Sequence, residues 1–511
     1  MSKVSRRGIL KGIVAGALVL GFDPAGRSWI TEARASAPFA SIPALDGTLS
    51  TDPGVLAEVS DDWGHMVHRT PVAVLQPASV DDVVKMVNYC RAHGIKIASR
   101  GRGHTAFGQS QAAAGLVIDL RTLDEIHDIG NGYAVVDAGV IWRDLLLAAI
   151  EEGQTPPVLT DYINLTVAGT LSVGGVGGSS FLYGAQVDNV EELTVVTGAG
   201  KLVTCSRHKQ KALFDAALAG LGLCAVIVRV KLKLIPAEER ALTYRLYYAD
   251  VATMLNDTRT IIAKKRFDNV RCQGMPGPDG WTLYIEATRF YTAPTDPCAA
   301  RTVVDEDDDD DDDDAVENRD IDHLLEKLHF IPGATEIEDR DYFDYCDLTV
   351  QIFNTLGQFG LLGLPHPWLD LFVGSSKANA FVSSSVAGLN ASIFLPGSLI
   401  LIYPLVTKKL KQPMFRVPNE KVAFLFDILP TIPPDPGLIN LVLQQNRALF
   451  EQNRAQGGTH YTISAVQLSP ADWRAHFGSS WSALSAAKQA NDPANILGAG
   501  VNVFAPSVGT D

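Results

Sequence analysis

Two glycine-dense segments are the parts of this sequence best suited to hold a ligand. The first, residues 100–109, reads RGRGHTAFGQ, and the second, residues 167–178, reads VAGTLSVGGVGG. Glycine lets a backbone approach a ligand closely and turn its N–H groups toward phosphate oxygens. Two such segments can grip a diphosphate from both sides, although either one alone could be a tight turn that binds nothing.

A third glycine pattern does not indicate a nicotinamide site. Residues 220–225 read GLGLCA, which fits the pattern G-x-G-x-x-[GA]. This segment follows an expected helix and precedes an expected strand, whereas the dinucleotide fingerprint needs the opposite order, because the helix N-terminus must face the pyrophosphate. The sequence also lacks the Walker A, HExxH and GxSxG patterns, so nucleotide hydrolysis, zinc proteolysis and α/β-hydrolase chemistry have no support.

The six cysteines do not form a metal-binding pattern. They are scattered along the chain without a CxxC pair or a ligand-like pairing with histidine. This spacing argues against zinc and iron–sulfur chemistry, and we expect no metal. Buried free thiols are the expected state, although the count also permits a disulfide.

The composition is that of a globular protein with more than one domain. The chain has 511 residues, of which 46% are hydrophobic and 20% charged, and its formal net charge is −15. Residues 305–314 are all acidic, and we expect them to form a solvated, disordered loop because adjacent like charges repel and cannot pack. No basic stripe stands out, so the sequence gives no sign of a nucleic acid partner.

The N-terminal residues are typical of a twin-arginine signal peptide, which we expect over residues 1–37. Arg6 and Arg7 precede a weakly apolar stretch that ends at Phe22, and Ala35 and Ala37 offer cleavage points. An ordinary basic tail is the alternative. Because the twin-arginine route exports folded proteins, the signal predicts a tightly bound cofactor and a periplasmic or extracellular location.

No stretch of the sequence is expected to span a membrane. The N-terminal apolar core is too short for a crossing, which takes roughly 20 residues. Residues 393–406 are the next candidate, but Pro396 and Pro404 interrupt them, so we expect core strands there.

A mixture of helices and strands is expected to position the glycine segments. The sequence predicts a strand at 72–75, a helix capped by Ser79 that runs to His93, and a strand at 95–98 that leads into the first glycine segment. Further strands are expected at 116–120, 133–138, 193–197 and 202–206, with helices at 142–152 and 212–218. Beyond residue 240, strands at 242–248 and 281–290 flank an amphipathic helix at 251–262.

The first glycine segment resembles the covalent-flavin loop of the vanillyl-alcohol-oxidase-type (PCMH) FAD-binding superfamily, and within it the chain is most similar to cytokinin dehydrogenases. Other segments that resemble family blocks are residues 160–172, 195–206, 365–373, 402–404, 473–478 and 492–497. The block PHPWLDLFV is the most specific, because it belongs to the substrate domain. The resemblance implies an α+β, two-domain fold: an FAD-binding domain from residues 55–240 and 456–511, with a substrate-binding cap domain, 241–455, inserted between them.

The chain also departs from the family pattern. Residues 498–501 read GAGV where the family has Ser/Ala-Pro-Gly-Gln, so a side chain expected near the flavin is missing. Residues 357–364 lack the acidic residue and the tryptophan expected there, and the acidic run is an insertion. These departures bear on the substrate more than on the fold.

By this resemblance the cofactor is FAD, bound covalently through the imidazole of His104. A covalent bond would raise the flavin potential and prevent cofactor loss after export; the alternative is a histidine that only forms hydrogen bonds in a glycine turn. The other positions that match the family's FAD contacts are Gly101, Arg102, Gly103, Thr105, Gln109, Asp161, Thr166, Ser172, Val176, Ile227 and Tyr461.

The resemblance implies oxidation of N6-isoprenoid adenines such as isopentenyladenine. A hydride would leave the side-chain carbon beside the amine for flavin N5, and the imine would hydrolyse to adenine and an unsaturated aldehyde. Asp161 matches the carboxylate that accepts the amine N–H, and a carboxylate among apolar groups can accept a proton near neutral pH. Glu286 matches the carboxylate that binds the purine edge, and Trp368 would shape the cavity. On sequence alone, these three could also be a turn aspartate, an outward strand residue and a core tryptophan.

Two other functions stay open at this point. One is a different flavin oxidase of the same fold that acts on a sugar or an alcohol, although the subtype with a second cysteine link is disfavoured because no cysteine lies between Cys90 and Cys205. The other is an exported flavoprotein that only binds a ligand. The expected electron acceptor is a quinone-like compound or dioxygen, and the protein is expected to be a monomer.

Overall fold

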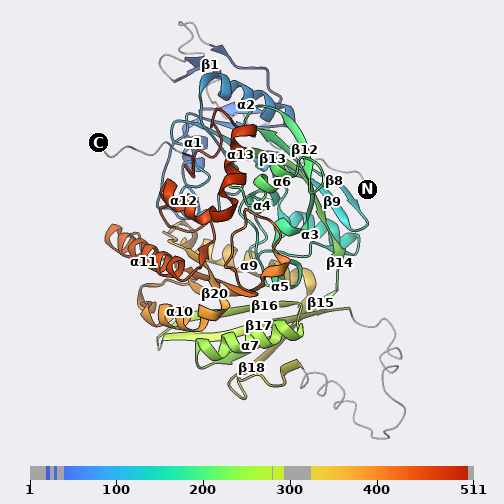
Figure 1. Ribbon diagram of the computed structural model, residues 1–511, viewed down its shortest axis with the longest axis vertical. Coiled ribbons are helices and arrows are strands. Elements are labelled where there is room, and N and C mark those ends of the chain that lie inside the picture. The colour runs from blue at the N-terminus through green and yellow to red at the C-terminus, as the bar shows by residue number, and fades with distance from the viewer. Residues whose placement is uncertain (1–18, 24–27, 32–39, 279, 293–323, 505–511) are drawn as a thin grey trace.

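The computed structural model of the chain describes residues 19–23, 28–31, 40–278, 280–292 and 324–504 (Figure 1). The twin-arginine pair, the cleavage candidates Ala35 and Ala37 and the acidic run 305–314 lie outside these residues. Within them, no helix has the length and apolar character needed to cross a membrane. The five cysteines in the described part of the chain are free, and four of them are buried.

A four-stranded sheet carries the first glycine segment at the end of one strand. Its order is β4 (Thr48–Ser50), β5 (Ala73–Gln76), β7 (Leu116–Asp119) and β6 (Ile97–Arg100). The last three strands are parallel, and α2 (Val80–His93) connects β5 to β6. A capping box between Ser79 and Asp82 starts this helix. The strand–helix–strand unit predicted before the first glycine segment is therefore confirmed.

A five-stranded antiparallel sheet packs beside the first sheet and positions the second glycine segment. Its order is β12 (Leu202–Ser206), β11 (Val190–Thr197), β13 (Ala225–Lys233), β9 (Tyr133–Asp137) and β8 (Ile126–Gly130). The helices of this region are α1 (Pro53–Val59), α3 (Trp142–Glu151), α4 (Val167–Leu171), α5 (Ser180–Tyr183) and α6 (Lys211–Ala217). Residues 220–225 lie between α6 and β13, the helix-then-strand order expected of a segment that is not a nicotinamide site.

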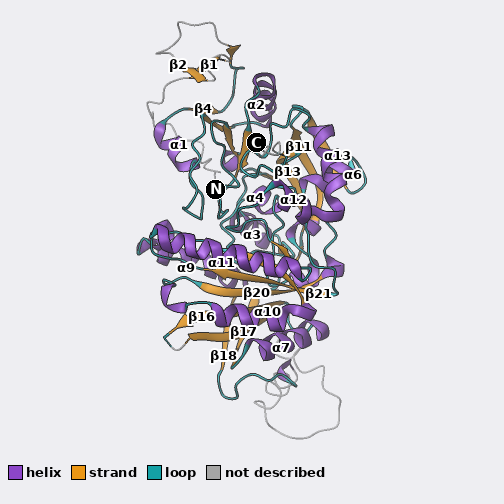
Figure 2. Ribbon diagram, turned by 60° about the vertical axis from the view of Figure 1, so that its left-hand side comes forward, coloured by secondary structure: helices purple, strands orange, loops and turns teal. Residues whose placement is uncertain are grey.

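An eight-stranded antiparallel sheet forms a second body (Figure 1). Its order is β18 (Thr335–Asp341), β15 (Arg240–Tyr248), β17 (Gly280–Tyr291), β16 (Asn269–Gly277), β20 (Leu399–Val406), β21 (Val422–Leu429), β19 (Leu369–Gly374) and β22 (Thr459–His460). Helices α7 (Val251–Lys264) and α10 (Ser375–Gly388) cover its outer face. Figure 2 shows α9 (Tyr342–Gln358) and α11 (Pro436–Ala455) on the opposite side of the strands, toward the first body.

Residues 393–406 differ from the expected core strands. Only Leu399–Val406 form a strand, β20, and a turn at Pro396 and Gly397 precedes it. Gly397 has φ +92°, which a strand residue does not adopt.

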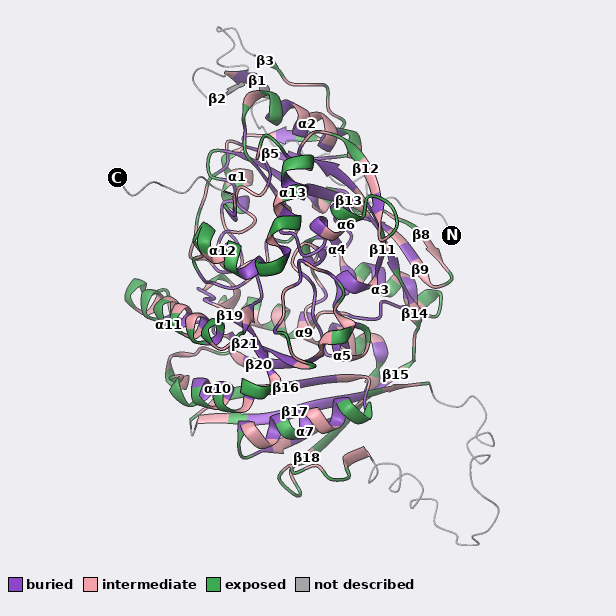
Figure 3. Cartoon of the chain, in the orientation of Figure 1, coloured by how far each residue is buried: buried purple, intermediate pink, exposed green. Residues whose placement is uncertain are grey.

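After β22, which pairs with β19, the chain leaves the large sheet and returns to the first body. Helices α12 (Pro470–Phe477) and α13 (Trp481–Asn491) follow, and α13 contacts α6. The Ile97 N–H donates to the Ile496 carbonyl at 2.7 Å, which fixes the returning chain beside β6. Buried residues concentrate along the strands of both bodies (Figure 3). The α+β class with two bodies agrees with the prediction from the sequence.

Candidate active site

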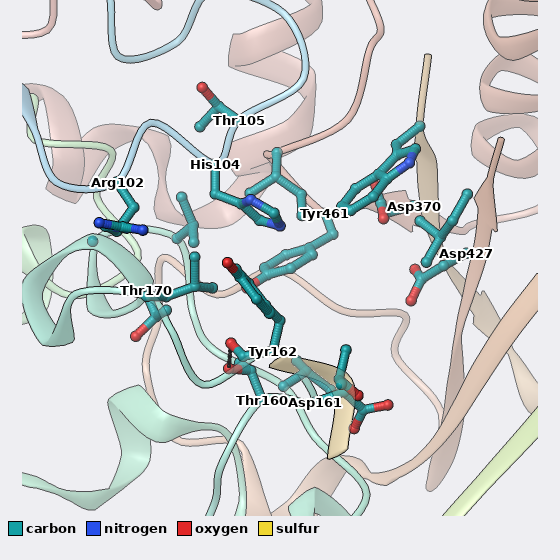
Figure 4. Close-up of a pocket in the computed structure, with 18 of the residues that line it drawn as sticks. Arg102, His104, Thr105, Thr160, Asp161, Tyr162, Thr170, Asp370, Asp427 and Tyr461 are labelled. Atoms are coloured by element: carbon teal, nitrogen blue, oxygen red, sulfur yellow. Dashed lines mark hydrogen bonds between the residues drawn. The ribbon is translucent and has the colours of Figure 1, made fainter. Parts of the chain in front are cut away.

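A cavity of about 440 Å³ lies where the two glycine segments face the inner side of the large sheet. Figure 4 shows that its lining side chains come from both bodies. Every residue that the sequence analysis assigned to cofactor or substrate lines this cavity: Gly101, Arg102, Gly103, His104, Thr105, Gln109, Asp161, Thr166, Ser172, Val176, Ile227, Glu286, Trp368 and Tyr461. The structure thus brings these residues together, while the role of each one stays a prediction.

At Gly101 the first glycine segment closely approaches Thr166, the residue that precedes the second segment. A Cβ atom on Gly101 would stand 2.0 Å from the Thr166 hydroxyl, so no larger residue fits at this point of contact. Gly103 has φ +68°, the left-handed region that favours glycine. In the described part of the chain, the backbone N–H groups of residues 102–105 have no hydrogen-bond acceptor. They are therefore available to a ligand with phosphate or carbonyl oxygens.

Asp62 holds the first glycine segment in place, a role that the sequence analysis missed. Its Oδ2 atom accepts hydrogen bonds from the Gly108 N–H at 2.5 Å and from the Thr105 hydroxyl at 3.0 Å. Burial raises the pKa of Asp62 to about 6, although these hydrogen bonds act in the opposite direction. Asp62 stands beside a second aspartate, Asp61, and no pattern in the sequence distinguishes it.

His104 lies in an aromatic setting. Its ring centroid is 4.5 Å from that of Trp63, 5.2 Å from that of Tyr162 and 5.4 Å from that of Trp368. Burial lowers the pKa of His104 to about 3, and the charges of His366 and Arg102 act in the same direction. The imidazole is therefore neutral at neutral pH and keeps a nitrogen lone pair, as a nucleophilic histidine requires.

Asp161 and Glu286 are joined by Arg271, which the sequence analysis did not identify. Arg271 Nη1 donates to Asp161 Oδ2 at 2.5 Å, and Arg271 Nε donates to Glu286 Oε2 at 2.6 Å. The Tyr403 side chain lies close to Asp161 and also lines the cavity. Asp161 therefore does not lie in the apolar setting expected from the sequence; it is an ion-paired carboxylate at the cavity wall.

Glu286 also accepts hydrogen bonds from Arg245 Nη2 at 2.9 Å and Gln273 Nε2 at 2.8 Å. Burial raises the pKa of Glu286, but the charges and hydrogen bonds of Arg271 and Arg245 outweigh it and leave the pKa below its ordinary value. Glu286 is thus anionic and anchors three polar side chains at the cavity. The alternative of a solvated, outward glutamate does not fit, because the residue is 5% exposed.

Strand register explains why Arg271 lies there. In the hairpin of β16 and β17, Arg271 stands directly opposite Glu286, and Arg245 of β15 stands opposite Glu286 on its other side. Directly opposed charges of unlike sign attract across a sheet. The strand at 269–277 was not predicted, so nothing in the sequence analysis placed Arg271 opposite Glu286.

The second glycine segment is fixed by Tyr461. The Gly175 N–H donates to the Tyr461 hydroxyl at 2.9 Å, and Gly175 has φ +75°. Ser172 and Val176 of this segment line the cavity on one side of that contact, and Ile227 of β13 lines it as well.

The returning chain at residues 498–501 closes the cavity near Gln109. A Cβ atom on Gly500 would stand 2.2 Å from the Gln109 carbonyl oxygen, so the glycine permits a close approach. Arg69 Nη1 donates to the carbonyl groups of both Gly108 and Gly500 at 2.9 Å. Val501 lines the cavity, so an apolar side chain stands where the family pattern led us to expect a polar one.

Family comparisons match two parts of the chain. Residues 71–206 match the family described as "FAD binding domain", and residues 301–504 match the family described as "Cytokinin dehydrogenase 1, FAD and cytokinin binding". The free N–H groups of the first glycine segment and the neutral His104 fit an FAD cofactor.

Curated relatives are similar over most of their length. An uncharacterized oxidoreductase of the fasciation locus of Rhodococcoides fascians is 36% identical and covers 89% of this chain and 99% of its own. Cytokinin dehydrogenase 6 of Oryza sativa subsp. japonica is 32% identical, covering 89% of this chain and 91% of its own. Cytokinin dehydrogenase 2 of Arabidopsis thaliana is 31% identical, with coverages of 90% and 94%.

A solved structure shares the fold. The crystal structure of 6-hydroxy-D-nicotine oxidase from Arthrobacter nicotinovorans superposes with a TM-score of 0.66 over 89% of this chain and 96% of its own, at 20% identity. With the FAD-binding match, this similarity confirms the predicted two-domain flavoprotein fold of the vanillyl-alcohol-oxidase type.

Proposed function

Since this chain belongs to the cytokinin dehydrogenase family of FAD-dependent oxidoreductases, we propose that it cleaves N6-isoprenoid adenines such as isopentenyladenine to adenine and an unsaturated aldehyde. The observation that carries this proposal is the single cavity lined both by the histidine segment and by the Asp161–Arg271–Glu286 cluster. When bound, FAD supplies the acceptor for the hydride that leaves the side-chain carbon beside the amine.

His104 is proposed to bond FAD covalently. Its neutral imidazole and its place at the cavity wall, next to the free N–H groups of residues 102–105, support this assignment. Thr105 and Gly108, fixed by Asp62, keep the segment in a single conformation.

Asp161 is proposed to accept the N–H of the substrate amine. Arg271 fixes its carboxylate at the cavity, and a carboxylate has lone pairs left for a further partner. This contact orients the amine and stabilises the positive charge that develops on nitrogen as the hydride leaves. The resulting imine then hydrolyses in water.

Glu286 is proposed to bind the purine edge as part of its cluster. Its oxygens already accept from Arg271, Arg245 and Gln273, so a purine N–H adds to this set or replaces one member of it. Trp368 packs near His104 and shapes the cavity between the two regions.

Anaerobic mixing of the purified protein with isopentenyladenine tests the proposal. We expect the flavin absorbance to bleach and adenine to appear in equal amount. A flavin that is reduced only by a sugar or an alcohol would replace this function with that of another oxidase, and a flavin reduced by none of them would indicate a protein that only binds its ligand.

The cellular setting is a proposal of its own. The N-terminal twin-arginine sequence supports export to the periplasm or the exterior, and a quinone-like compound or dioxygen is proposed as the electron acceptor. Fractionation of cells that express the full chain tests the location, with an Arg6→Lys, Arg7→Lys variant as the control retained inside.

A further inference from the structure

Two buried aspartates lie side by side on the large sheet where it faces the cavity. Asp370 of β19 stands directly opposite Asp427 of β21, and both line the cavity wall. They are 2% and 5% exposed. Figure 4 shows their side chains next to each other on the strand side of the cavity, with Tyr461 nearby. Neither aspartate has a role in the mechanism proposed above.

The two carboxyl groups stand at directly opposed positions of neighbouring strands and are buried, and two carboxylates this close in a buried site do not both stay ionised, so the pair holds a proton. Burial and the charge of its neighbour raise the pKa of Asp427 well above its ordinary value, and burial raises the pKa of Asp370 to about 7. Asp370 has a second partner, since the Ser464 hydroxyl donates to its Oδ2 atom at 2.8 Å. Apart from Asp370, Asp427 has no hydrogen-bond partner among the described residues, and its Oδ1 atom is buried without any.

Apart from Asp370 and the nearby Asp161, the surroundings of Asp427 on this face of the sheet are apolar. Leu425 and Leu429 flank it on its own strand, and Leu401 stands opposite it on β20; all three line the cavity. A carboxyl group that is buried among leucines and keeps free hydrogen-bonding positions is costly unless a ligand engages it. The pair therefore offers a ligand hydrogen-bonding groups in a part of the cavity that is otherwise lined by leucines.

Strand spacing relates this pocket to the proposed substrate. Asp161 is bonded to Arg271 of β16 and lies close to Tyr403 of β20, so it lies over these two strands. Glu286 on β17 stands directly opposite Arg271. Asp427 on β21 stands opposite Leu401 of β20, so it lies about 4.8 Å across the sheet and two residues, or about 7 Å, along the strand from Tyr403. With the amine at Asp161 and the purine toward Glu286, the side chain points to Asp427. Its four bonds of about 1.5 Å each, a hydroxyl group on the terminal carbon and a hydrogen bond of about 2.8 Å together span this diagonal.

We propose that the Asp370–Asp427 pair binds a hydroxyl group on the terminal side-chain carbon of the substrate and makes the protein selective for hydroxylated cytokinins. This inference rests on the proposed function. A hydroxyl group both donates and accepts hydrogen bonds, as does a carboxyl pair that holds one proton. An unhydroxylated side chain leaves the free positions of Asp427 unpaired, which is the basis of discrimination in sites built for a hydroxyl.

The test compares kcat/KM for flavin reduction by trans-zeatin, which carries this hydroxyl, with that by isopentenyladenine, which lacks it. In the holoenzyme we expect a preference for trans-zeatin of about tenfold or more. Asp427→Leu should abolish the preference, because leucine completes the apolar pocket. Asp427→Asn should keep most of it, because the amide still offers a donor and an acceptor. The control is Asp257→Asn, which alters a buried aspartate of α7 on the outer side of the same sheet.

The outcomes separate the inference from the function on which it rests. If neither substrate reduces the flavin, the proposed function fails. If both reduce it equally well in the unmodified protein, or if Asp427→Leu leaves the ratio unchanged, the inference fails alone. A changed flavin spectrum in the variant, with equal losses on both substrates, would place the pair against the cofactor and also overturn it. Should Asp427→Leu not fold, the O-methyl ether of trans-zeatin gives the same answer with the unmodified protein, since loss of the O–H donor should lower kcat/KM by about tenfold.

Discussion

At the scale of single residues, His104 carries the covalent assignment. His104→Ala should fold and retain at most dissociable FAD, because the substitution removes the imidazole and leaves the glycine backbone and the Asp62 contacts in place. Acid precipitation checks this: the unmodified protein should give a yellow pellet and the variant a colourless one. Free flavin in the supernatant of the unmodified protein would remove the covalent bond from the proposal but not the cofactor.

Asp161 and Glu286 should differ in the kinetic step that they affect. Asp161→Asn keeps the shape but loses the anionic acceptor, so flavin reduction should slow by about a hundredfold or more with little change in apparent affinity. Glu286→Gln should mainly weaken apparent affinity, because a purine contact is made about equally in the ground and transition states. Anaerobic stopped-flow reduction separates the two quantities. Unchanged reduction in Asp161→Asn would take this residue out of the mechanism.

Residues with local signals were predictable and those made by strand pairing were not. His104 and its glycines form one short segment, so their chemistry shows in the sequence. Arg271 and the Asp370–Asp427 pair acquire their partners through antiparallel register between strands that are distant in the chain. No local pattern reveals that register. The expected apolar setting of Asp161 was wrong for the same reason, because its partner Arg271 is placed by strand pairing.

At the scale of elements, the first glycine segment depends on Asp62. The pKa of Asp62 is about 6 in the folded protein and should be near 3.8 in the unfolded chain, so the folded state binds this proton more tightly. The stabilisation from this bound proton is complete below pH 4 and is lost as the pH rises through 6. The loss lowers the free energy of unfolding by on the order of 2–3 kcal/mol.

Asp62→Asn resembles the protonated form at every pH. The Tm of this variant minus the Tm of the unmodified protein should therefore be larger at pH 7.5 than at pH 4.5. Thermal unfolding at the two pH values measures this gain. An identical Tm difference at both would show that Asp62 does not titrate in that range. Asp144→Asn, at an exposed position of α3, is the control.

Helices and strands were predicted correctly where the sequence pattern that specifies them is local. The Ser79 cap and the helix periodicity placed α2 correctly, and α3, α6 and α7 were found within one or two residues of their ends. Strand β16 was missed because Gly274 and Pro276 interrupt its apolar pattern. The strand region expected at 393–406 was too long, because the turn before β20 is itself largely apolar.

At the scale of the whole molecule, the active cavity exists only because the chain leaves the first body and returns to it. The large sheet supplies Arg271 and Glu286, and the residue before β19 supplies Trp368. The returning chain supplies Tyr461 and Val501. The inserted arrangement came from the family resemblance, since no compositional feature marks where the chain passes from one body to the other. Bonds such as that of Ile97 to Ile496 then hold distant parts of the chain at one cavity wall.

The acidic run, residues 305–314, tests whether this assembly needs every part of the chain. Ten adjacent carboxylates repel one another and have no apolar surface to bury, so they should contribute little to the free energy of unfolding. Deleting them should leave turnover of isopentenyladenine within about twofold and Tm nearly unchanged. Turnover and thermal unfolding of the holoenzyme at low and moderate ionic strength are the measurements, because salt screens any long-range effect of the lost charge. A large loss of activity at both ionic strengths would mean that the run acts by contact, as part of a lid or a partner site, rather than as a solvated charge.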